Sequence, residues 1–195
     1  MNVFKRKNIC TEQNQTYSSK NTHPNFNLSG DALAIAEGEG RNAVYLAEQG
    51  MQVTSWDIAQ SGLDKTVQLA KDRSVTVSTE LVDLSQAIWP ENKWDEIICV
   101  FGHYPQEVQQ QTFEGVKRAL KPGGYFLMEV YSVDQLHYGT GGPKSEQLLY
   151  RPEEVLTAFT DYRIVHFFTG EVIRNEGTLH NGLSHVIQLA VQKPI

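Results

Sequence analysis

The sequence predicts an α/β fold in which helices cover both faces of a mostly parallel, seven-stranded sheet that closes with a C-terminal antiparallel hairpin. Three observations support this prediction. From residue 31 onward, segments typical of buried strands alternate with helical segments, as in sheets whose parallel strands are joined by helices. A glycine-rich turn follows the first strand, and a turn-forming stretch joins the last two strands. Such a Rossmann-like sheet binds ligands at the carboxyl ends of its parallel strands.

The chain is long enough for one domain with its own core, which we place at residues 28–195. Residues 1–27 are rich in Asn, Gln, Ser, Thr and Lys and show no sustained period, so they are expected to form a polar, loosely ordered leader. No apolar run approaches the roughly 20 residues that a membrane span needs. The charged start lacks the apolar block of a secretory signal. We therefore expect no association with a membrane.

Charge and cysteine content restrict the partners and the compartment. The formal net charge of −6 and the scattered Lys and Arg residues argue against a nucleic-acid partner. Cys10 and Cys99 are isolated from each other and do not form a disulfide framework, which favours a reducing, cytoplasmic setting. No metal site is predicted. A homodimer, in which the leader of a neighbouring chain contributes to the site, stays open.

The first half of the chain supplies three strands and two helices. The expected strands span residues 32–36, 52–56 and 75–82, and the expected helices span residues 41–49 and 61–72. Gly50 is expected to close the first helix, because glycine is common just past a helix end. Ser61 is expected to cap the second helix, because its hydroxyl can accept a hydrogen bond from a free backbone N–H group.

The second half supplies four strands and two helices. The expected strands span residues 96–101, 125–131, 162–174 and 183–191, and the expected helices span residues 107–120 and 152–159. The first of these strands is a continuous apolar run, which is typical of the middle of a sheet. Residues 121–124, Lys-Pro-Gly-Gly, predict a turn, and a glycine-rich loop is expected at residues 139–144. The turn-forming residues 175–182 predict a hairpin between the last two strands.

Polar residues follow three successive strands. Glu37-Gly38-Glu39-Gly40 separates the first strand from its helix, and such glycines allow a ligand to approach the backbone beside a helix amino end. Asp57 ends the second strand, where a carboxylate can accept hydrogen bonds from ribose hydroxyls. Asp83 follows the third strand, where an acceptor can meet an adenine amino group. A tight turn or a helix cap explains each feature separately, but their place on one sheet edge predicts a nucleoside ligand.

Several segments resemble the tellurite-resistance methyltransferases and their relatives. Residues 37–47, EGEGRNAVYLA, are similar to the Gly-x-Gly-Arg-Asn segment of that family. The resemblance continues through VTSWD at 53–57, FGHYP at 101–105, LKPGG at 120–124, YGTGGP at 138–143 and the pattern Glu-Gly-x-x-His-x-Gly at 176–182, and it covers about residues 22 to 194. It implies a class I methyltransferase fold with S-adenosylmethionine as methyl donor.

The resemblance also implies which residues contact the cofactor. Carried over by position, they are Ala36, Glu37, Gly38 and Gly40 at the methionine end, Asp57 and Ile58 at the ribose, Asp83 and Leu84 at the adenine, and Phe101 beneath the cofactor. Arg41 and Asn42 open the helix beside the expected cofactor carboxylate. A nicotinamide dinucleotide is the alternative, because Gly38-x-Gly40-x-x-Ala43 fits the relaxed dinucleotide fingerprint. The Pro-Gly-Gly turn, the closing hairpin and the absence of a Tyr-x-x-x-Lys pair favour S-adenosylmethionine.

The sequence departs from the family pattern in three ways. Ala34 and Ala36 stand where many class I members have an acidic residue and a glycine, and Glu37 is expected to supply the missing charge near the methionine ammonium. The segment from Asn25 to Asp31 is short, whereas relatives usually place a helix before the first strand. No Asn-Pro-Pro-Tyr motif follows the fourth strand, which argues against amino groups of nucleic-acid bases as acceptors.

The acceptor is expected at the loops after the later strands. His103 and Tyr104 are the expected catalytic residues, because a histidine there can take a proton near neutral pH or bind an anion when charged. Tyr138, Arg174 and His180 are the expected substrate contacts, and the arginine offers donors suited to an oxyanion. The expected reaction is methyl transfer to a small soft nucleophile or oxyanion, such as a thiol or a metalloid of the tellurite or selenite type. A non-catalytic S-adenosylmethionine-binding protein and a protein methyltransferase are the alternatives.

Overall fold

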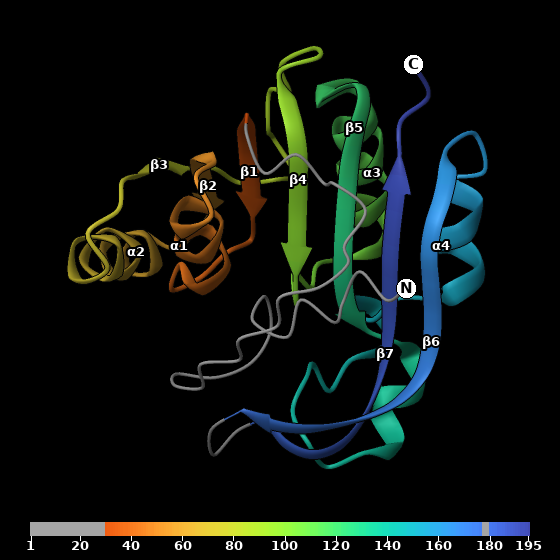
Figure 1. The fold of residues 1–195 in the computed structure, drawn as a ribbon. Helices are drawn as coiled ribbons and strands as arrows, with labels where there is room; N and C mark the ends of the chain where they lie inside the picture. The colour runs from red at the N-terminus through yellow and green to blue at the C-terminus, as the bar shows by residue number, and fades with distance from the viewer. Residues whose placement is uncertain (1–29, 177–179) are drawn as a thin grey trace, which may run out of the picture.

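The structure is a computed structural model that describes residues 30–176 and 180–195, with the backbone alone described at residues 174–176, 180 and 181. Seven strands form one sheet in the order β3-β2-β1-β4-β5-β7-β6 (Figure 1). The strands are β1 Asp31–Ile35, β2 Gln52–Asp57, β3 Val77–Leu81, β4 Trp94–Val100, β5 Leu120–Tyr131, β6 Arg163–Glu176 and β7 His180–Gln192. The helices are α1 Arg41–Glu48, α2 Gln60–Asp72, α3 Gln106–Ala119 and α4 Pro152–Ala158, with short 3-10 turns η2 Val133–His137 and η3 Glu146–Leu148.

The pairing of the strands confirms the predicted mixed sheet. The strands from β3 to β5 are parallel to their neighbours, whereas β7 pairs antiparallel with both β5 and β6. The hairpin is longer than predicted, because pairs such as Asn175 with Asn181 continue the ladder into the stretch expected to be a turn. A register shift between Ile164 and His166 interrupts β6 near its start. The leader predicted at residues 1–27 lies outside the described residues.

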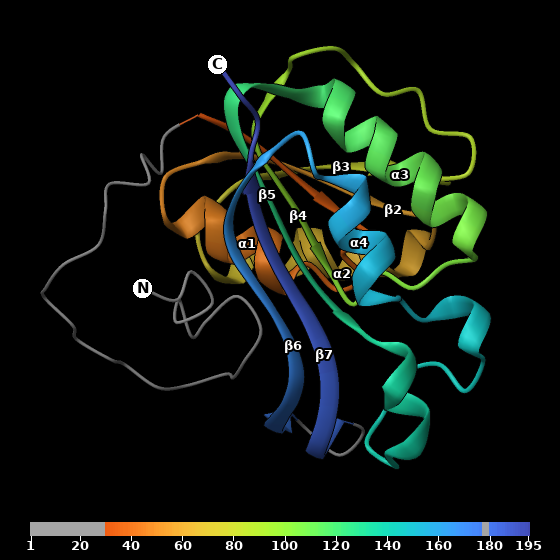
Figure 2. The same cartoon turned by 90° about the vertical axis from the view of Figure 1, so that its right-hand side faces the viewer.

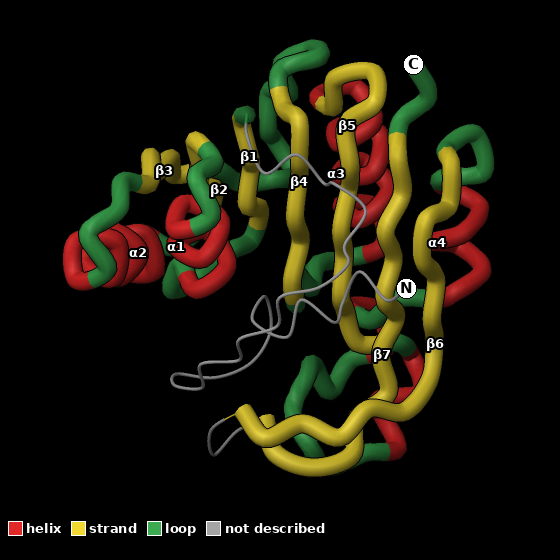
Figure 3. Tube along the Cα trace, viewed as in Figure 1, coloured by secondary structure: helices red, strands yellow, loops and turns green. Residues whose placement is uncertain are grey.

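Helices cover both faces of the sheet, as predicted. Figures 1 and 3 show α1 and α2 on one face beside β1 to β3, and α3 and α4 on the other face behind β4 to β6. The first face is lined by the small side chains of Ala32 and Ala34, which bring the sheet close to Ala43 and Leu46 of α1. Larger side chains fill the other face; they include Trp56, Trp94, Ile97, Phe113, Phe126 and Phe159. Small and large residues alternate along β1, so its small side chains face α1 and α2 and its large side chains face the other pair of helices.

Two local predictions need correction. Helix α2 begins at Gln60, with Ala59 as its cap residue, so the predicted Ser61 cap is wrong. The carboxylate of Asp57 accepts a hydrogen bond from the N–H group of Ala59 at 2.8 Å. The turn expected at residues 121–124 lies within β5, where Gly123 has φ 80° and donates its N–H group to the carbonyl of Lys193. Residues 121–124 thus stand between two paired parts of β5, which pairs with β4 at Leu120 and again from Tyr125, and Lys193 just beyond β7 bonds to them.

The carboxyl ends of β1 to β5 meet at one edge of the sheet, the lower edge in Figure 1. The ladder between β5 and β7 ends at Tyr131 and Val186, but β6 and β7 continue together beyond that point. Their far ends curve below the carboxyl edge in Figure 1, and Figure 2 shows the same extension from the β6 side. Within the described residues, no helix is both long and apolar enough to cross a membrane.

Candidate active site at the carboxyl edge

The glycine-rich loop joins β1 to α1 at the carboxyl edge of the sheet. Ala36, Gly38 and Gly40 all have positive φ angles, of 51°, 65° and 83°. A Cβ atom at Gly40 would lie 2.5 Å from Thr66, so close packing against α2 requires glycine there. A Cβ atom at Gly38 would meet no atom within 4 Å. Gly38 therefore borders open space, and its predicted contact with a cofactor stays a prediction.

Glu37 occupies the amino end of α1 with a buried carboxylate. Its Oε1 atom accepts hydrogen bonds from the N–H groups of Asn42 at 2.7 Å and Ala43 at 3.0 Å. Burial raises the pKa of Glu37 to about 7, although these hydrogen bonds and the charge of Arg41 oppose the rise. In dinucleotide-binding folds the pyrophosphate binds at this helix end. The carboxylate of Glu37 already occupies the N–H groups at the amino end of α1. The loop therefore favours a cationic ligand over a dinucleotide, whose pyrophosphate would need those N–H groups.

Asp57 ties the glycine-rich loop to the start of α2. Its two carboxylate oxygens accept hydrogen bonds from the N–H groups of Gly38 at 2.7 Å and Ala59 at 2.8 Å. A carboxylate has about four acceptor positions, so acceptor capacity is left for ribose hydroxyls. The neighbouring Ile58 side chain is 68% exposed and offers an apolar surface that a planar ring can cover. These features fit an adenosyl group beside the open space at Gly38.

Asp83 and Leu84 follow β3 on the same edge. The register of β2 and β3 sets Leu81 beside Asp57, so Asp83 lies two residues further along. Asp83 is exposed, and hydrogen bonds from the hydroxyl and the N–H group of Ser85 lower its pKa. Leu84 is half-buried and packs against the larger core cluster. The predicted contacts of these two residues with adenine stay predictions.

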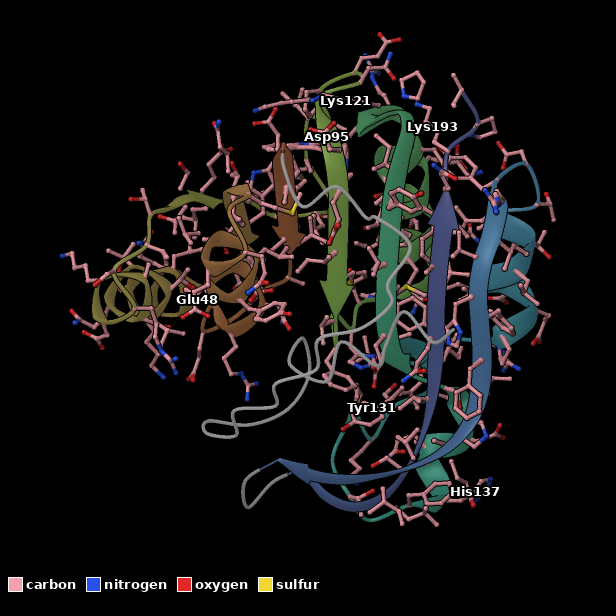
Figure 4. The ribbon with its side chains drawn as sticks, in the orientation of Figure 1. Glu48, Asp95, Lys121, Tyr131, His137 and Lys193 are labelled. Carbon is pink, nitrogen blue, oxygen red and sulfur yellow. The ribbon has the colours of Figure 1, made fainter. Side chains whose placement is uncertain are left out.

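Aromatic rings gather where β4 and β5 end. Phe101 has φ 56°, and its ring stacks on that of Tyr131, with centroids 4.7 Å apart. The ring of His103 also stacks on Tyr131 at 5.5 Å and meets Tyr150 edge-on at 5.8 Å. Figure 4 places Tyr131 at the lower end of β5, away from the ion pair of Asp95 and Lys121 at the upper end of the sheet. The expected acceptor side is thus aromatic.

The imidazole of His103 has a defined tautomer. Its Nδ1 atom lies 3.0 Å from the carbonyl oxygen of Leu148. A carbonyl can only accept a hydrogen bond, so Nδ1 carries the proton. Burial lowers the pKa of His103 to about 4, which leaves the ring neutral near pH 7. The Nε2 atom is buried and has no hydrogen-bond partner among the described residues.

Tyr104 points into the protein interior. Its hydroxyl lies 3.2 Å from the Sγ atom of Cys99, and a Cβ atom at Gly102 would meet both groups within 2.8 Å. Burial raises the pKa of Cys99 to about 11 and that of Tyr104 well above 10. Both groups are therefore protonated at neutral pH and pack behind Gly102. The catalytic role expected for Tyr104 stays a prediction.

The expected substrate residues are only partly described. Tyr138 donates its hydroxyl to the carboxylate of Glu171 on β6 at 2.7 Å. The backbone of Arg174 and His180 lies at the far ends of β6 and β7, but their side chains lie outside the described part of the structure. Their contacts with an acceptor stay predictions.

Sequence reasoning gave no role to the residues that hold the glycine-rich segment at 139–143. The hydroxyl of Thr140 lies 2.9 Å from that of Ser184 and donates to the carbonyl of Leu183. The side chain of Gln135 donates to Thr140 at 3.3 Å and accepts the N–H group of His185 at 2.7 Å. The Thr-Gly-Gly-Pro motif marks this segment, but its contacts with β7 follow from pairings distant in the sequence.

Known proteins resemble this chain in sequence over part of its length. Residues 32–124 match the protein family described as "Methyltransferase domain". A 2-heptyl-1-hydroxyquinolin-4(1H)-one methyltransferase of Mycobacteroides abscessus is 28% identical over 107 residues, 53% of this chain and 47% of the relative. A probable S-adenosyl-L-methionine-dependent methyltransferase of Haemophilus influenzae, TehB, is 31% identical over 98 residues, 49% of this chain and 34% of the relative. The chain thus spans less than half the length of these curated relatives.

Solved structures share the fold. The crystal structure of TehB from Haemophilus influenzae has a TM-score of 0.68 and 22% identity, over 84% of this chain and 57% of that chain. The structure of the [4+2]-cyclase SpnF has a TM-score of 0.64 and 16% identity, over 85% of this chain and 75% of that chain. At these identities the likeness concerns the fold alone. Because a cyclase is among these structures, the fold alone does not determine the reaction.

Proposed function

Because the chain belongs to the class I S-adenosylmethionine-dependent methyltransferases of the TehB-like type, we propose that it transfers a methyl group from S-adenosylmethionine to a small soft nucleophile or oxyanion. One observation carries the proposal. The open space at Gly38, the carboxylate of Asp57 and the buried carboxylate of Glu37 come together at the carboxyl edge. This set suits a ligand that has a ribose and a positively charged group.

The side chains at this edge have distinct roles toward the cofactor. Asp57 accepts hydrogen bonds from the ribose hydroxyls while its bonds to Gly38 and Ala59 hold it in place. Ile58 covers one side of the adenosyl group. Glu37 provides negative charge near the methionine end, and the α1 amide groups orient its carboxylate. When bound, S-adenosylmethionine supplies a methyl group already activated by its sulfonium.

The protein's main task is then to align the acceptor. Holding two reactants in line is worth roughly 7–11 kcal/mol of the barrier. The stacked rings of Phe101 and Tyr131 lie at the ends of β4 and β5 and give one side of this region an aromatic surface. His103 lies against Tyr131, and its Nε2 atom is buried without a hydrogen-bond partner among the described residues, so it can accept a hydrogen bond from a methyl acceptor that enters this region.

The acceptor class has three candidate members. The family resemblance favours a metalloid oxyanion of the tellurite or selenite type. A thiol meets the same requirement for a soft nucleophile. The name of the Mycobacteroides abscessus relative identifies a hydroxyquinolone as the acceptor of that protein, and the aromatic rings around His103 favour a flat acceptor of this kind.

A second function is favoured by a specific observation. Phe101, Tyr131 and His103 stack on one another, so the rings fill part of the space beside the expected methyl group. A protein that binds S-adenosylmethionine without catalysis and acts through a partner is compatible with such filling. This alternative predicts cofactor binding without turnover.

A transfer assay tests both proposals. The protein is incubated with S-adenosylmethionine and, separately, with thiophenol, sodium selenite, sodium tellurite or 2-heptyl-1-hydroxyquinolin-4(1H)-one, and S-adenosylhomocysteine is measured. The proposal predicts release of S-adenosylhomocysteine that depends on the acceptor and is lost in Asp57→Ala. Saturable cofactor binding with no release above the Asp57→Ala background for any acceptor would favour the non-catalytic protein.

A further inference from the structure

Resting on the proposed function, we propose that the acceptor is a neutral small molecule with an O–H or S–H group, and that Nε2 of His103 accepts the proton of this group. This proposal narrows the methyl acceptors of the proposed function to molecules with an O–H or S–H group and excludes oxyanions. The contacts of His103 with Leu148 and with the surrounding rings carry this proposal.

The direction of the Nδ1 hydrogen bond fixes the tautomer of His103. The carbonyl of Leu148 lies 3.0 Å from Nδ1 and keeps the proton on that nitrogen. In a neutral imidazole the other nitrogen is then an acceptor. Leu148 is the last residue of η3, and Arg151 pairs with the carboxylate of Glu146 at the first residue of the same turn. The tautomer is thus set by a chain segment that is itself held in place.

The Nε2 atom of His103 is left with an unused acceptor position. This atom is buried without a hydrogen-bond partner among the described residues. A buried acceptor without a partner costs about 1–3 kcal/mol, and such a group in a native protein calls for an explanation. A donor on the substrate explains the cost, because an O–H or S–H group placed beside Nε2 supplies the missing hydrogen bond.

The surroundings of the ring keep it uncharged. The described contacts of the ring are the carbonyl of Leu148 and the rings of Phe101, Tyr131 and Tyr150. None of these groups is an anion that would stabilise an imidazolium at neutral pH, and burial holds the pKa of His103 at about 4. Nε2 is uncharged and has a lone pair that accepts hydrogen bonds, so it repels an oxyanion and attracts a hydrogen-bond donor. His103 is therefore suited to a methyl acceptor that still carries its O–H or S–H proton.

The chemical step balances in the following way. The oxygen or sulfur of the acceptor forms a bond to the methyl carbon, and the bond from that carbon to the sulfonium breaks with its electron pair going to sulfur. The O–H or S–H proton moves to Nε2 and later to solvent. An oxygen or sulfur that gains a methyl group while protonated becomes strongly acidic, so a weakly basic imidazole suffices. A methylated amine keeps its proton far more tightly, which disfavours amines.

The first test uses a matched pair of variants. In His103→Asn, the amide nitrogen can still donate to Leu148, but no acceptor remains at the position of Nε2. We expect its affinity for S-adenosylmethionine to stay within about twofold of the wild type by calorimetry, because the contacts at Gly38 and Asp57 are intact. Its kcat/KM for thiophenol and 2-heptyl-1-hydroxyquinolin-4(1H)-one should fall by roughly 10²–10⁴-fold, mainly in kcat. The control is His137→Asn at the exposed end of η2, which should leave both quantities unchanged.

The second test measures the protonation state of the His103 ring directly. ¹⁵N NMR of the free protein should give His103 as a neutral ring with the proton on Nδ1. Adding either protic probe to the S-adenosylhomocysteine complex should shift the Nε2 resonance, whereas sodium selenite should not. With saturating S-adenosylmethionine, which removes the influence of Glu37 on cofactor binding, turnover of a protic probe between pH 8 and pH 5 should change only with the ionisation of the probe itself and not with that of His103. Burial raises the pKa of Tyr150 well above its ordinary value, so the phenol of Tyr150 beside the ring stays neutral across this range.

The two tests separate the inference from the proposed function. Loss of S-adenosylmethionine binding by the wild-type protein would overturn the proposed function and the inference with it. Intact cofactor binding with an Nε2 signal that no protic probe moves would overturn the inference alone. Selenite turnover at saturating S-adenosylmethionine that rises below about pH 6.5, the ordinary pKa of histidine, and that loses this rise in His103→Asn would also overturn the inference alone, because such a rise requires a His103 imidazolium.

Discussion

The two halves of the carboxyl edge differ in how their polar groups are held. On the cofactor side, Glu37 bonds to an N–H group five residues away and Asp57 to one 19 residues away. On the acceptor side, His103 bonds to a carbonyl 45 residues away. Burial opposes the charged form of a group in each half, since it raises the pKa of Glu37 to about 7 and lowers that of His103 to about 4. The carboxylates expected to bind the cofactor are thus held by N–H groups nearby in the sequence. The histidine on the side of the methyl acceptor is held by a residue from a distant segment.

The largest effect that sharpens this comparison is the pH dependence caused by Glu37. Its pKa is about 7 in the folded protein and 4.5 as an ordinary glutamate. The folded state therefore binds more protons between these values, and stability falls as pH rises through this window. The loss attributable to Glu37 between pH 5 and pH 8 should be about 2–3 kcal/mol. Urea unfolding of the wild type and Glu37→Gln at both pH values measures it, and the variant should lack this fall.

The matched control for this experiment is the neighbouring Glu39, which is exposed and pairs with Lys65. Glu39→Gln should keep the pH dependence of the wild type. If Glu37→Gln and the wild type lose the same free energy of unfolding between pH 5 and pH 8, the carboxylate of Glu37 does not titrate in this window. Its assignment as a buried, half-charged group would then be wrong.

The next largest effect concerns the affinity for the cofactor. Asp57→Ala removes the acceptor for the ribose hydroxyls and releases the N–H groups of Gly38 and Ala59. S-adenosylmethionine should bind about 1.5–3 kcal/mol more weakly, or roughly ten- to 150-fold in Kd, by calorimetry. Asp95→Ala is the control, because Asp95 lies at the opposite end of the sheet (Figure 4). Equal losses of affinity in the two variants would contradict the assignment of the site to the carboxyl edge.

A smaller effect separates the two glycines of the loop. Each has a positive φ angle, and alanine in this region costs roughly 1–2 kcal/mol. Gly40→Ala also places a Cβ atom 2.5 Å from Thr66, whereas Gly38→Ala meets no atom within 4 Å. We expect Gly40→Ala to lose more stability in thermal unfolding. Gly38→Ala should lose more affinity for S-adenosylmethionine than its loss of stability explains, and an unchanged affinity would mean that the space at Gly38 holds no ligand.

The smallest effect is expected on the acceptor side, at Thr140. Thr140→Val keeps the shape but removes the hydroxyl that bonds to Leu183 and lies 2.9 Å from the hydroxyl of Ser184. The loss should be about 1 kcal/mol and should raise KM for the acceptor several-fold in steady-state assays. Affinity for S-adenosylmethionine should not change. A fall in cofactor affinity in this variant would mean that the two halves are not independent.

The sequence predicts the fold well because the relevant signals are local. The alternation of apolar strands and helices gives the seven-stranded sheet, and the turn-forming residues after β6 give the antiparallel hairpin. Gly50 closes α1 with φ 95°, as expected of a glycine past a helix end. The residues Glu37, Asp57 and Asp83 fall at successive strand ends, so their common edge follows from the parallel topology. Their binding roles stay predictions.

The contacts made between distant segments could not be predicted. The Ser61 cap is wrong because the helix begins at Gln60, where the carbonyl of Ala59 accepts the first helical N–H groups and Asp57 holds the N–H group of Ala59. The tautomer of His103 depends on Leu148, and its stacking depends on Tyr131 at the end of another strand. No spacing in the sequence encodes these contacts. The aromatic residue that closes β5 is the one signal that could have pointed to the stack.

Calorimetry of the wild-type protein with S-adenosylmethionine, S-adenosylhomocysteine and NADH tests the central claim most directly. Glu37 fills the helix end that a pyrophosphate would need, and Asp57 keeps acceptor capacity for a ribose. We therefore predict saturable binding of the two adenosyl ligands and none of NADH. Saturable binding of NADH with no binding of the other two would contradict the account.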